Sequence, residues 1–242
     1  MSKLSNKNIL ITGSTKGIGK EISLGISAKG ANVILLGRNS EELEKLYDHI
    51  SKEYKTSPMI IECDLENLDQ NQANEINNEI LKAYGNLDAV INNASLLGKM
   101  SALSDYELET WDRIIKVNLT ASFLLSKSLI PALLNSDMPR IIFTSSGVAI
   151  QGRAFWGAYA ISKAATKSMA EIFKEELEGT SNIKVFNFDP GATRTSMRAF
   201  AYPAEDPSTL KKPKDLLKCY EWLLSEESSS SQEHYFTFDS LN

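Results

Sequence analysis

Tyr159 and Lys163 are the residues of this sequence whose types and spacing most directly suggest chemistry. The composition of residues 155–178 predicts a helix, which would place the two side chains four positions apart on one face. A phenol titrates at about 10 when unperturbed, and a nearby ammonium group stabilises the phenolate and lowers that pKa. We therefore predict that Tyr159 is a general acid/base and that Lys163 lowers its pKa. Taken alone, the same pair would also suit an ordinary helix surface.

Ser146 lies thirteen residues before Tyr159, at the end of an apolar run over residues 141–144. Its hydroxyl could hold a substrate oxygen while Tyr159 transfers the proton. The chain has only two histidines and two cysteines, and none of them has metal-ligand spacing. We therefore predict no metal site, and we regard a Ser-His-Asp hydrolase or a zinc dehydrogenase as disfavoured.

The length allows one α/β domain or two small ones, and the absence of repeats, of a long linker and of a change in composition predicts one domain over residues 1–242 of a soluble protein. The sequence is 42% hydrophobic, enough to bury a sizeable core, and its net charge of -5 argues against a nucleic-acid partner. The first residues contain no apolar signal-peptide region, and no apolar run reaches the ~18 residues that a bilayer crossing needs. We expect a cytoplasmic protein with no membrane partner.

A glycine-rich stretch separates a predicted strand over residues 8–12 from an amphipathic helix that continues to residue 29. Glycines allow a tight turn and close approach to a ligand, and the positive end of the helix dipole favours a pyrophosphate. Its spacing is G-x-x-x-G-x-G rather than G-x-G-x-x-G, and a tight turn without a ligand is the alternative. The candidate cofactor-binding residues of this stretch are Gly13, Ser14, Thr15, Lys16, Gly17, Ile18 and Gly19.

Arg38 follows a second predicted strand over residues 32–36, where a dinucleotide fold meets the adenosine ribose. An acidic residue at this point would bind a 2′-hydroxyl, whereas an arginine accommodates a 2′-phosphate. No acid stands at this strand end, and Lys16 can add a second positive charge. The pattern favours NADP(H) over NAD(H) as cofactor, and the alternative is that both side chains are solvated surface cations.

Further predicted strands alternate with helices, which indicates a parallel, doubly wound α/β sheet. Ser40 is the predicted cap of a helix over residues 40–54. Asp64 could accept a hydrogen bond from an adenine amino group, cap the next helix, or do both. The candidate cofactor contacts that follow the third, fourth and sixth strands are Asp64, Leu65, Asn93, Ala94, Pro190, Gly191, Thr193 and Thr195.

Two further segments bear on the site. Residues 104–135 read as broken or consecutive helices, with Asn118 at a mid-helix position where its side chain should kink the helix or hold a water. Residues 196–214 are aromatic and interrupted by prolines, so we interpret them as a substrate lid, with a surface excursion as the alternative. An apolar pocket is suggested by Phe155, Trp156, Met197, Phe200 and Tyr202. Arg153 or Arg198 could meet an acid group of the substrate, and the alternative is that either is a surface charge.

Together these motifs resemble those of the short-chain dehydrogenase/reductase family, and they look closest to its YciK-like bacterial branch. The matching pieces are Thr12-Gly-x-x-x-Gly-x-Gly19, Asp64, Asn92-Asn-Ala94, Asn118, Ser146, Tyr159-x-x-x-Lys163 and Pro190-Gly191-x-x-x-Thr195. Three features depart from the family pattern. Ser95 replaces the usual glycine, and Asp189 stands where asparagine is common. The last strand lacks the usual glycine pair after Asp239, which bears on the C-terminal interface of a tetramer more than on the chemistry.

The resemblance implies a Rossmann-like sheet of about seven strands in the order 3-2-1-4-5-6-7, with helices on both faces. It also implies a catalytic tetrad of Asn118, Ser146, Tyr159 and Lys163. In that tetrad Tyr159 would be the acid/base, Lys163 would also hold the nicotinamide ribose, Ser146 would orient a carbonyl, and Asn118 would hold a relay water.

The expected reaction is hydride transfer between nicotinamide C4 and the carbonyl or alcohol carbon of a small molecule. The expected assembly is a homodimer or homotetramer formed through the helices of residues 104–135 and 155–178. The main alternative is a non-catalytic NADP(H)-binding regulatory or scaffold protein on the same fold, although such proteins tend to lose the tyrosine or the lysine. An enoyl reductase of the same superfamily is disfavoured because its Tyr–Lys spacing is longer.

Overall fold

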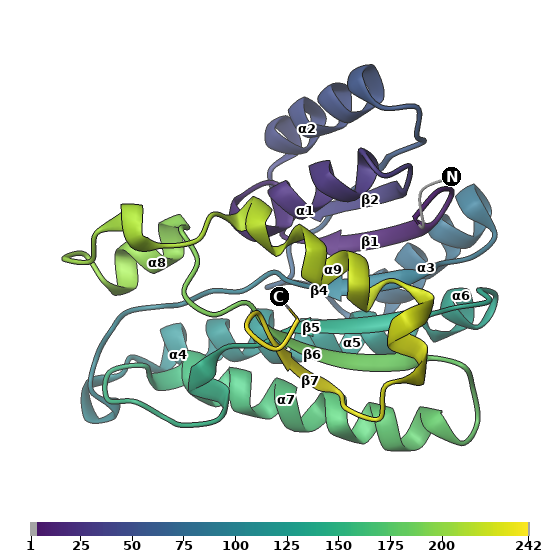
Figure 1. Cartoon of the computed structure of the whole chain (residues 1–242). Helices are drawn as coiled ribbons and strands as arrows, with labels where there is room; N and C mark the ends of the chain where they lie inside the picture. Colours follow the sequence, from purple (N-terminus) through teal and green to yellow (C-terminus); the bar gives the residue numbers. More distant parts are fainter. Residues whose placement is uncertain (1–3, 242) are drawn as a thin grey trace.

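Short runs rich in Ile, Leu and Val form the strands of a single parallel sheet in the computed structural model, which describes residues 4–241. The strand order is β3-β2-β1-β4-β5-β6-β7, and every neighbouring pair is parallel. The predicted order is therefore confirmed (Figure 1). The strands are β1 (Asn8–Thr12), β2 (Asn32–Gly37), β3 (Met59–Glu62), β4 (Ala89–Asn92), β5 (Arg140–Thr144), β6 (Lys184–Asp189) and β7 (Tyr235–Thr237).

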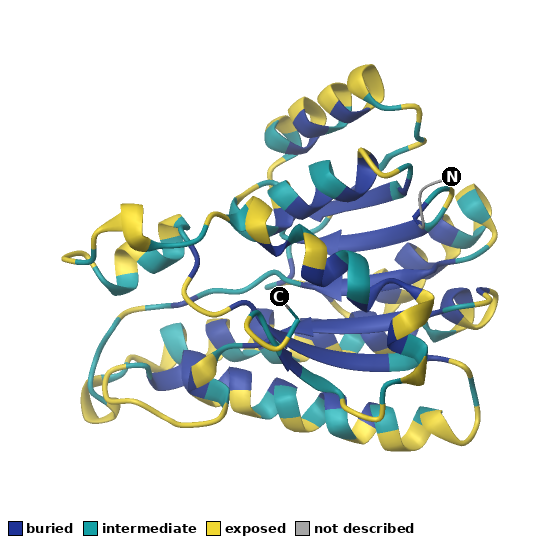
Figure 2. Ribbon diagram, in the orientation of Figure 1, coloured by how far each residue is buried: buried dark blue, intermediate teal, exposed yellow. Residues whose placement is uncertain are grey.

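Helices cover both faces of the sheet, and two apolar clusters fill the space between them. One cluster joins the sheet to α1 (Gly17–Ser27), α2 (Ser40–Glu53) and α9 (Leu217–Leu223). The other joins it to α3 (Gln70–Tyr84), α5 (Ala121–Ser128), α6 (Ile130–Leu134) and α7 (Gly157–Glu178). The central strands are buried on both faces, as their unbroken apolar runs require (Figure 2).

The residues that cap two of the helices differ from the predicted ones. Asn39, not Ser40, caps α2, because its side chain accepts a hydrogen bond from the Glu42 backbone N–H at 3.0 Å. Helix α3 begins with a capping box between Asp69 and Gln72. Asp64 therefore does not cap that helix.

Residues 104–135 form consecutive helices, as the sequence indicated. Helix α4 (Leu108–Ile115) passes through a π-helical segment, Lys116–Thr120, into α5. Asn118 lies in this π-helical segment and is 2% exposed. Single π-helical turns of this kind often occur at functional sites.

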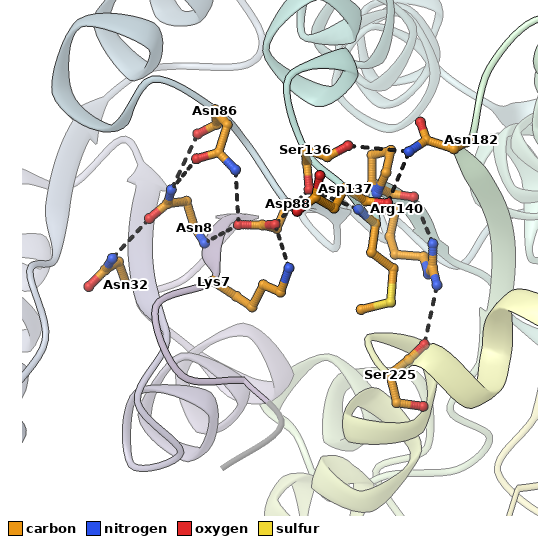
Figure 3. A network of polar contacts seen from close by, with 12 residues as sticks. Lys7, Asn8, Asn32, Asn86, Asp88, Ser136, Asp137, Arg140, Asn182 and Ser225 are labelled. Carbon is orange, nitrogen blue, oxygen red and sulfur yellow. Dashed lines mark hydrogen bonds and ion pairs between the residues drawn. The ribbon is translucent and has the colours of Figure 1, made fainter. Parts of the chain in front are cut away.

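Polar side chains tie together the amino ends of the strands, at the edge of the sheet opposite the glycine loop (Figure 3). The Asp88 carboxylate accepts hydrogen bonds from Lys7 Nζ at 2.9 Å, Ser136 Oγ at 2.6 Å and the Asn8 backbone N–H at 2.8 Å. Asn8 Nδ2 in turn donates to Asn86 Oδ1 at 2.7 Å. These bonds satisfy buried polar groups within the protein, so we assign these residues a structural role at the amino ends of the strands.

Arg140, the first residue of β5, extends this polar edge toward the last helix. It is 1% exposed and donates to the backbone oxygens of Pro139 at 3.0 Å and Ser225 at 3.2 Å. Burial lowers the pKa of its guanidinium to about 10.

None of the helices formed by residues 4–241 has the length and apolar character that a bilayer crossing requires.

Candidate active site

The loops at the carboxyl ends of β1 to β6 surround one large cavity of about 760 Å³. It lies where open parallel sheets bind ligands, outside the strand ends and across the point between β1 and β4 where the strand order reverses. The predicted site residues that line it are Gly13, Thr15, Lys16, Gly17, Ile18, Arg38, Asp64, Leu65, Asn93, Ala94, Ser146, Tyr159, Lys163, Pro190, Gly191, Thr193 and Thr195.

Three predicted residues lie outside the cavity lining. Ser14 is fully buried, and its hydroxyl donates to the Leu36 carbonyl at 3.3 Å. Gly19 is buried in the first turn of α1, and a Cβ there would lie 2.3 Å from the carbonyl oxygen of Gly13. Asn118 is the third. These three residues are buried behind the residues that line the cavity and support the positions of those residues.

The glycine loop packs directly against the loop that follows β4. Gly13 has a φ of +65°, and a Cβ at this position would lie 3.0 Å from the Cα of Ala94. The Thr12 hydroxyl accepts hydrogen bonds from the backbone N–H groups of Asn93 and Ala94, each at 2.9 Å. A side chain at Gly13 would force the two loops apart, so glycine is required there by both conformation and space.

The adenosine end of the predicted cofactor site has the donors that a phosphorylated dinucleotide needs. Helix α1 has no side-chain cap, and its first residues, Gly17 and Ile18, line the cavity, so the helix start is open toward it. Lys16 and Arg38 are exposed, and neither takes part in an ion pair with another residue of the described chain. The residues present therefore fit a nucleotide that carries several phosphates.

Tyr159, Ser146 and Lys163 come together at the other end of the cavity, as predicted from their spacing. The predicted helix is α7, which begins at Gly157 rather than Phe155. Tyr159 is 7% exposed and Lys163 is 4% exposed. Lys163 Nζ donates to the Thr144 carbonyl at the end of β5 at 2.7 Å and lies 5.7 Å from the Tyr159 ring centroid.

The predicted direction of the Tyr159 pKa is wrong for this structure. Burial raises the pKa of Tyr159 to about 12, the Ser146 side chain opposes this rise by a hydrogen bond, and Asp189 adds to it. Burial also lowers the pKa of the Lys163 ammonium to about 8, against the opposing effect of Asp189. Removal from water disfavours the phenolate form of Tyr159 and the ammonium form of Lys163. In each case this effect outweighs the opposing interaction, which is the Ser146 hydrogen bond for Tyr159 and the Asp189 charge for Lys163.

Asn118 holds three elements together from behind the cavity. Its Oδ1 accepts from the Leu96 backbone N–H at 2.7 Å, and its Nδ2 donates to the Leu96 carbonyl at 2.9 Å and to Ser162 Oγ at 3.0 Å. The π-helical segment is thereby joined to the loop after β4 and to α7 beside Tyr159. Asn118 thus positions the site through protein contacts, and its relay water remains a prediction.

Asp189, which the sequence marked only as a departure from the family pattern, proves to be part of the site. It ends β6, lines the cavity, is 9% exposed, and accepts a hydrogen bond from the Gly191 backbone N–H at 2.8 Å. Burial raises the pKa of its carboxyl group, while the charges of Lys211 and Lys163 act in the opposite direction. The carboxylate is therefore an electrostatic neighbour of Lys163.

The aromatic and basic residues suggested for a substrate pocket separate into two groups. Trp156, Met197 and Tyr202 line the cavity, whereas Phe155 and Phe200 are 58% and 60% exposed and do not. Arg153 and Arg198 both line it. Arg198 is already paired, however, because Glu205 accepts two hydrogen bonds from its guanidinium at 2.7 and 2.6 Å.

The chain is similar to known proteins over most of its length. A family model described as short chain dehydrogenase matches residues 7–206. The oxidoreductase YciK of Escherichia coli (strain K12) is 40% identical over 225 residues, which cover 93% of this chain and 88% of YciK. The predicted likeness to the YciK-like branch is therefore confirmed.

Solved structures agree with this comparison. A short chain dehydrogenase from Salmonella enterica serovar Typhi str. CT18 is 41% identical, with a TM-score of 0.93 and coverage of 98% of this chain and 96% of that one. Short chain dehydrogenases from Shigella flexneri 2a str. 301, in complex with NADP, and from Escherichia coli CFT073, in complex with NADPH, are each 39% identical with TM-scores of 0.93. They cover 98% of this chain, and 99% and 98% of their own chains are covered.

The Asp189→Asn variant should lower the pKa of Lys163 further below its value of about 8, because it removes the carboxylate that favours the ammonium form. The expected change is on the order of one pH unit, the size of effect that one charged neighbour produces. Asparagine can still accept the Gly191 hydrogen bond, so the backbone should be retained. The measurement is a pH titration of the Lys163 ε-carbon signal by NMR. Asp137→Asn, at an exposed position, is the control, and an unchanged or higher pKa in Asp189→Asn would contradict the assignment.

Proposed function

The chain belongs to the short-chain dehydrogenase family of oxidoreductases, and on this premise we propose that it transfers a hydride between NADP(H) and a carbonyl or alcohol carbon. The observation that carries the proposal is the shared cavity of about 760 Å³. The glycine loop and Arg38 line one end of it, and Ser146, Tyr159 and Lys163 line the other. A pocket with an open helix start at one end and a buried acid/base at the other suits this reaction.

NADP(H), rather than NAD(H), is the proposed cofactor. Lys16 and Arg38 would contact the 2′-phosphate, and no acidic residue stands at the end of β2 to repel it. Two of the solved relatives were crystallised with NADP or NADPH, which supports the same choice. Asp64 and Leu65 would lie beside the adenine, and Pro190, Gly191, Thr193 and Thr195 beside the nicotinamide.

The residues of this chain would control the transfer of one proton to the substrate. When bound, NADPH supplies the hydride that adds to the carbonyl carbon. Tyr159 would donate its phenolic proton to the carbonyl oxygen, which Ser146 would orient. The Lys163 ammonium would stabilise the phenolate that remains. Burial raises the pKa of Tyr159 to about 12, so the phenol is in the protonated form that a proton donor to the carbonyl oxygen requires at neutral pH.

Tyr159→Phe should abolish carbonyl reduction while leaving NADPH binding largely intact, because phenylalanine keeps the ring packing and lacks the hydroxyl group that donates the proton. We expect kcat to fall by at least about 100-fold, the lower range of what a positioned acid contributes. The measurement is NADPH consumption with a panel of aldehydes and ketones, together with NADPH affinity from nicotinamide fluorescence. Retained turnover would rule out the proposed role of Tyr159.

A nicotinamide-fluorescence titration of the unaltered protein with NADPH and with NADH tests the cofactor preference. NADPH should bind more tightly because its additional phosphate meets two basic side chains. Tighter NADH binding would overturn the phosphate assignment and leave the reductase proposal standing. Binding of NADPH without turnover of any carbonyl compound would favour a non-catalytic regulatory or scaffold role.

We also propose that residues 196–214 form a lid over the substrate. The cavity lining includes Ser196 and Met197 of helix α8 (Ser196–Ala201), and Tyr202 just beyond it. The ends of the segment are joined, because the Arg194 backbone N–H donates to the Lys211 carbonyl at 2.9 Å. In Figure 1, α8 lies to one side of the sheet, away from the other helices.

Tyr202→Ala should raise KM for a carbonyl substrate without changing NADPH affinity, because Tyr202 packs on Trp156 with ring centroids 5.9 Å apart. We expect a rise of about 3- to 10-fold, which corresponds to the loss of one aromatic pair. Phe200→Ala is the matched control, since Phe200 is exposed and lies outside the cavity lining. Equal effects of the two substitutions would argue against the lid.

We propose that two copies of this chain associate through α4, α5 and α7. These helices expose large apolar side chains, namely Leu108 (73%), Phe123 (41%), Ile161 (42%) and Ile172 (55%). Helices α4 and α7 pack against each other, so these side chains lie on neighbouring elements. If these side chains form one contiguous apolar patch, a subunit interface would cover it.

Phe123→Glu should shift the protein from dimer, or tetramer, toward monomer, because a carboxylate would be buried at the interface. The measurement is molar mass by analytical ultracentrifugation across a range of protein concentrations. Leu134→Glu is the control, since Leu134 is 51% exposed on α6 and lies outside the proposed interface. A wild-type protein that is monomeric at all concentrations would refute the assembly.

A further inference from the structure

Arg153 stands at the substrate end of the cavity without a partner, and we propose that the carbonyl substrate carries a carboxylate that binds this residue and an apolar, preferably aromatic body. This inference rests on the proposed reductase function and specifies its substrate class. Three observations carry it: the apolar wall around Tyr159, the separate pairing of Arg198, and the fixed loop that holds Arg153.

The wall around Tyr159 is apolar. Leu97, Val148 and Ala160 form a buried cluster with Tyr159, against which Trp156 and Met197 pack. The ring centroids of Trp156 and Tyr159 are 5.7 Å apart. A substrate whose carbonyl oxygen reaches Tyr159 would therefore have its body among aromatic and aliphatic side chains, which favours an apolar ligand.

Of the two arginines at this end, only the exposed Arg153 is without an ion-pair partner among residues 4–241, and the Lys163 ammonium is engaged by the Thr144 carbonyl. Arg198 is held by two hydrogen bonds from its guanidinium to Glu205, and the same guanidinium lies 3.8 Å from the Tyr202 ring centroid. The Arg153 side chain makes no hydrogen bond or ion pair within the described chain. A planar guanidinium with all its donors unused is well suited to bind a carboxylate.

Arg153 also lies on a different loop from Arg38, which is at the adenosine end. It follows β5, whereas Arg38 follows β2, and β1 and β4 lie between these strands. Three strand spacings correspond to about 14 Å. The two arginines therefore meet different parts of the cavity contents.

The loop that holds Arg153 has a fixed and strained backbone. Phe155 has a φ of +72°, a left-handed conformation that is unfavourable for a bulky residue, and its carbonyl accepts a hydrogen bond from the Ser101 backbone N–H at 3.2 Å. A Cβ at Gly157 would lie 2.4 Å from a ring atom of Tyr106, so that ring packs directly on the loop. Strain of this kind is retained where surrounding contacts enforce it and is common at ligand sites.

The test compares two ligands, para-carboxybenzaldehyde and its methyl ester, which differ by the negative charge and one methyl group. Binding to the protein–NADP⁺ complex, which has no hydride to donate, is measured by calorimetry and therefore does not depend on turnover. We expect the carboxylate to bind about tenfold more tightly than the ester, the lower range for a charge-assisted hydrogen bond. Arg153→Gln should remove this difference and leave the affinity of the ester unchanged.

Lys52→Gln, at an exposed position on α2, is the charge-matched control and should retain the preference. Equal affinities in the unaltered protein, or a preference that survives Arg153→Gln, would overturn the inference. Either result would leave the reductase proposal intact if Tyr159 is required for turnover of the ester. Failure of the protein to bind NADPH would instead refute the proposed function, and with it this inference.

Discussion

A buried ammonium group, that of Lys163, is the constraint on which the site depends. A charge removed from water is unfavourable unless polar groups compensate for it. The compensation comes from the Thr144 carbonyl at the end of β5 and from Asp189 at the end of β6. Helix α7 must therefore lie with this face against two particular strand ends. Because Tyr159 is one turn before Lys163 on that helix, the same constraint fixes the phenol within the cavity and beside Ser146.

Polar groups at the amino ends of the strands are satisfied within the protein, whereas several at the carboxyl ends are not. At the amino ends, Asp88 accepts three hydrogen bonds and Asn8 is bonded to its neighbours, so the groups are satisfied within the protein. At the carboxyl ends, Lys16, Arg38 and Arg153 are without ion-pair partners among residues 4–241, and α1 begins without a side-chain cap. Unsatisfied donors are retained where a ligand completes them. This difference favours a ligand site at the carboxyl ends of the strands, without appeal to the family likeness.

Much of the site could be predicted because it follows from local spacing. The i, i+4 relation of Tyr159 and Lys163 needs only a helix, and the glycine loop needs only a strand before it and a helix after it. The strand order came from the family resemblance, since alternation alone gives a parallel sheet without its order. The pKa of Tyr159 was predicted in the wrong direction because spacing indicates a neighbour but not the depth of burial, and here burial dominates. The cap of α2 was misplaced by one residue because Asn39 and Ser40 are both good caps.

Arg153 and Arg198 show most clearly where sequence reasoning stops. Both are arginines on segments near Tyr159, and nothing in their types or spacing separates them. The difference lies in Glu205, seven residues after Arg198, whose carboxylate engages one guanidinium and leaves the other available. The proposed catalytic groups are buried in helices and strand ends, where packing determines their positions, whereas the residues that would select a substrate lie on loops. A family likeness therefore identifies the reaction class well, and the substrate has to be inferred from which loop charges the folded protein leaves unpaired.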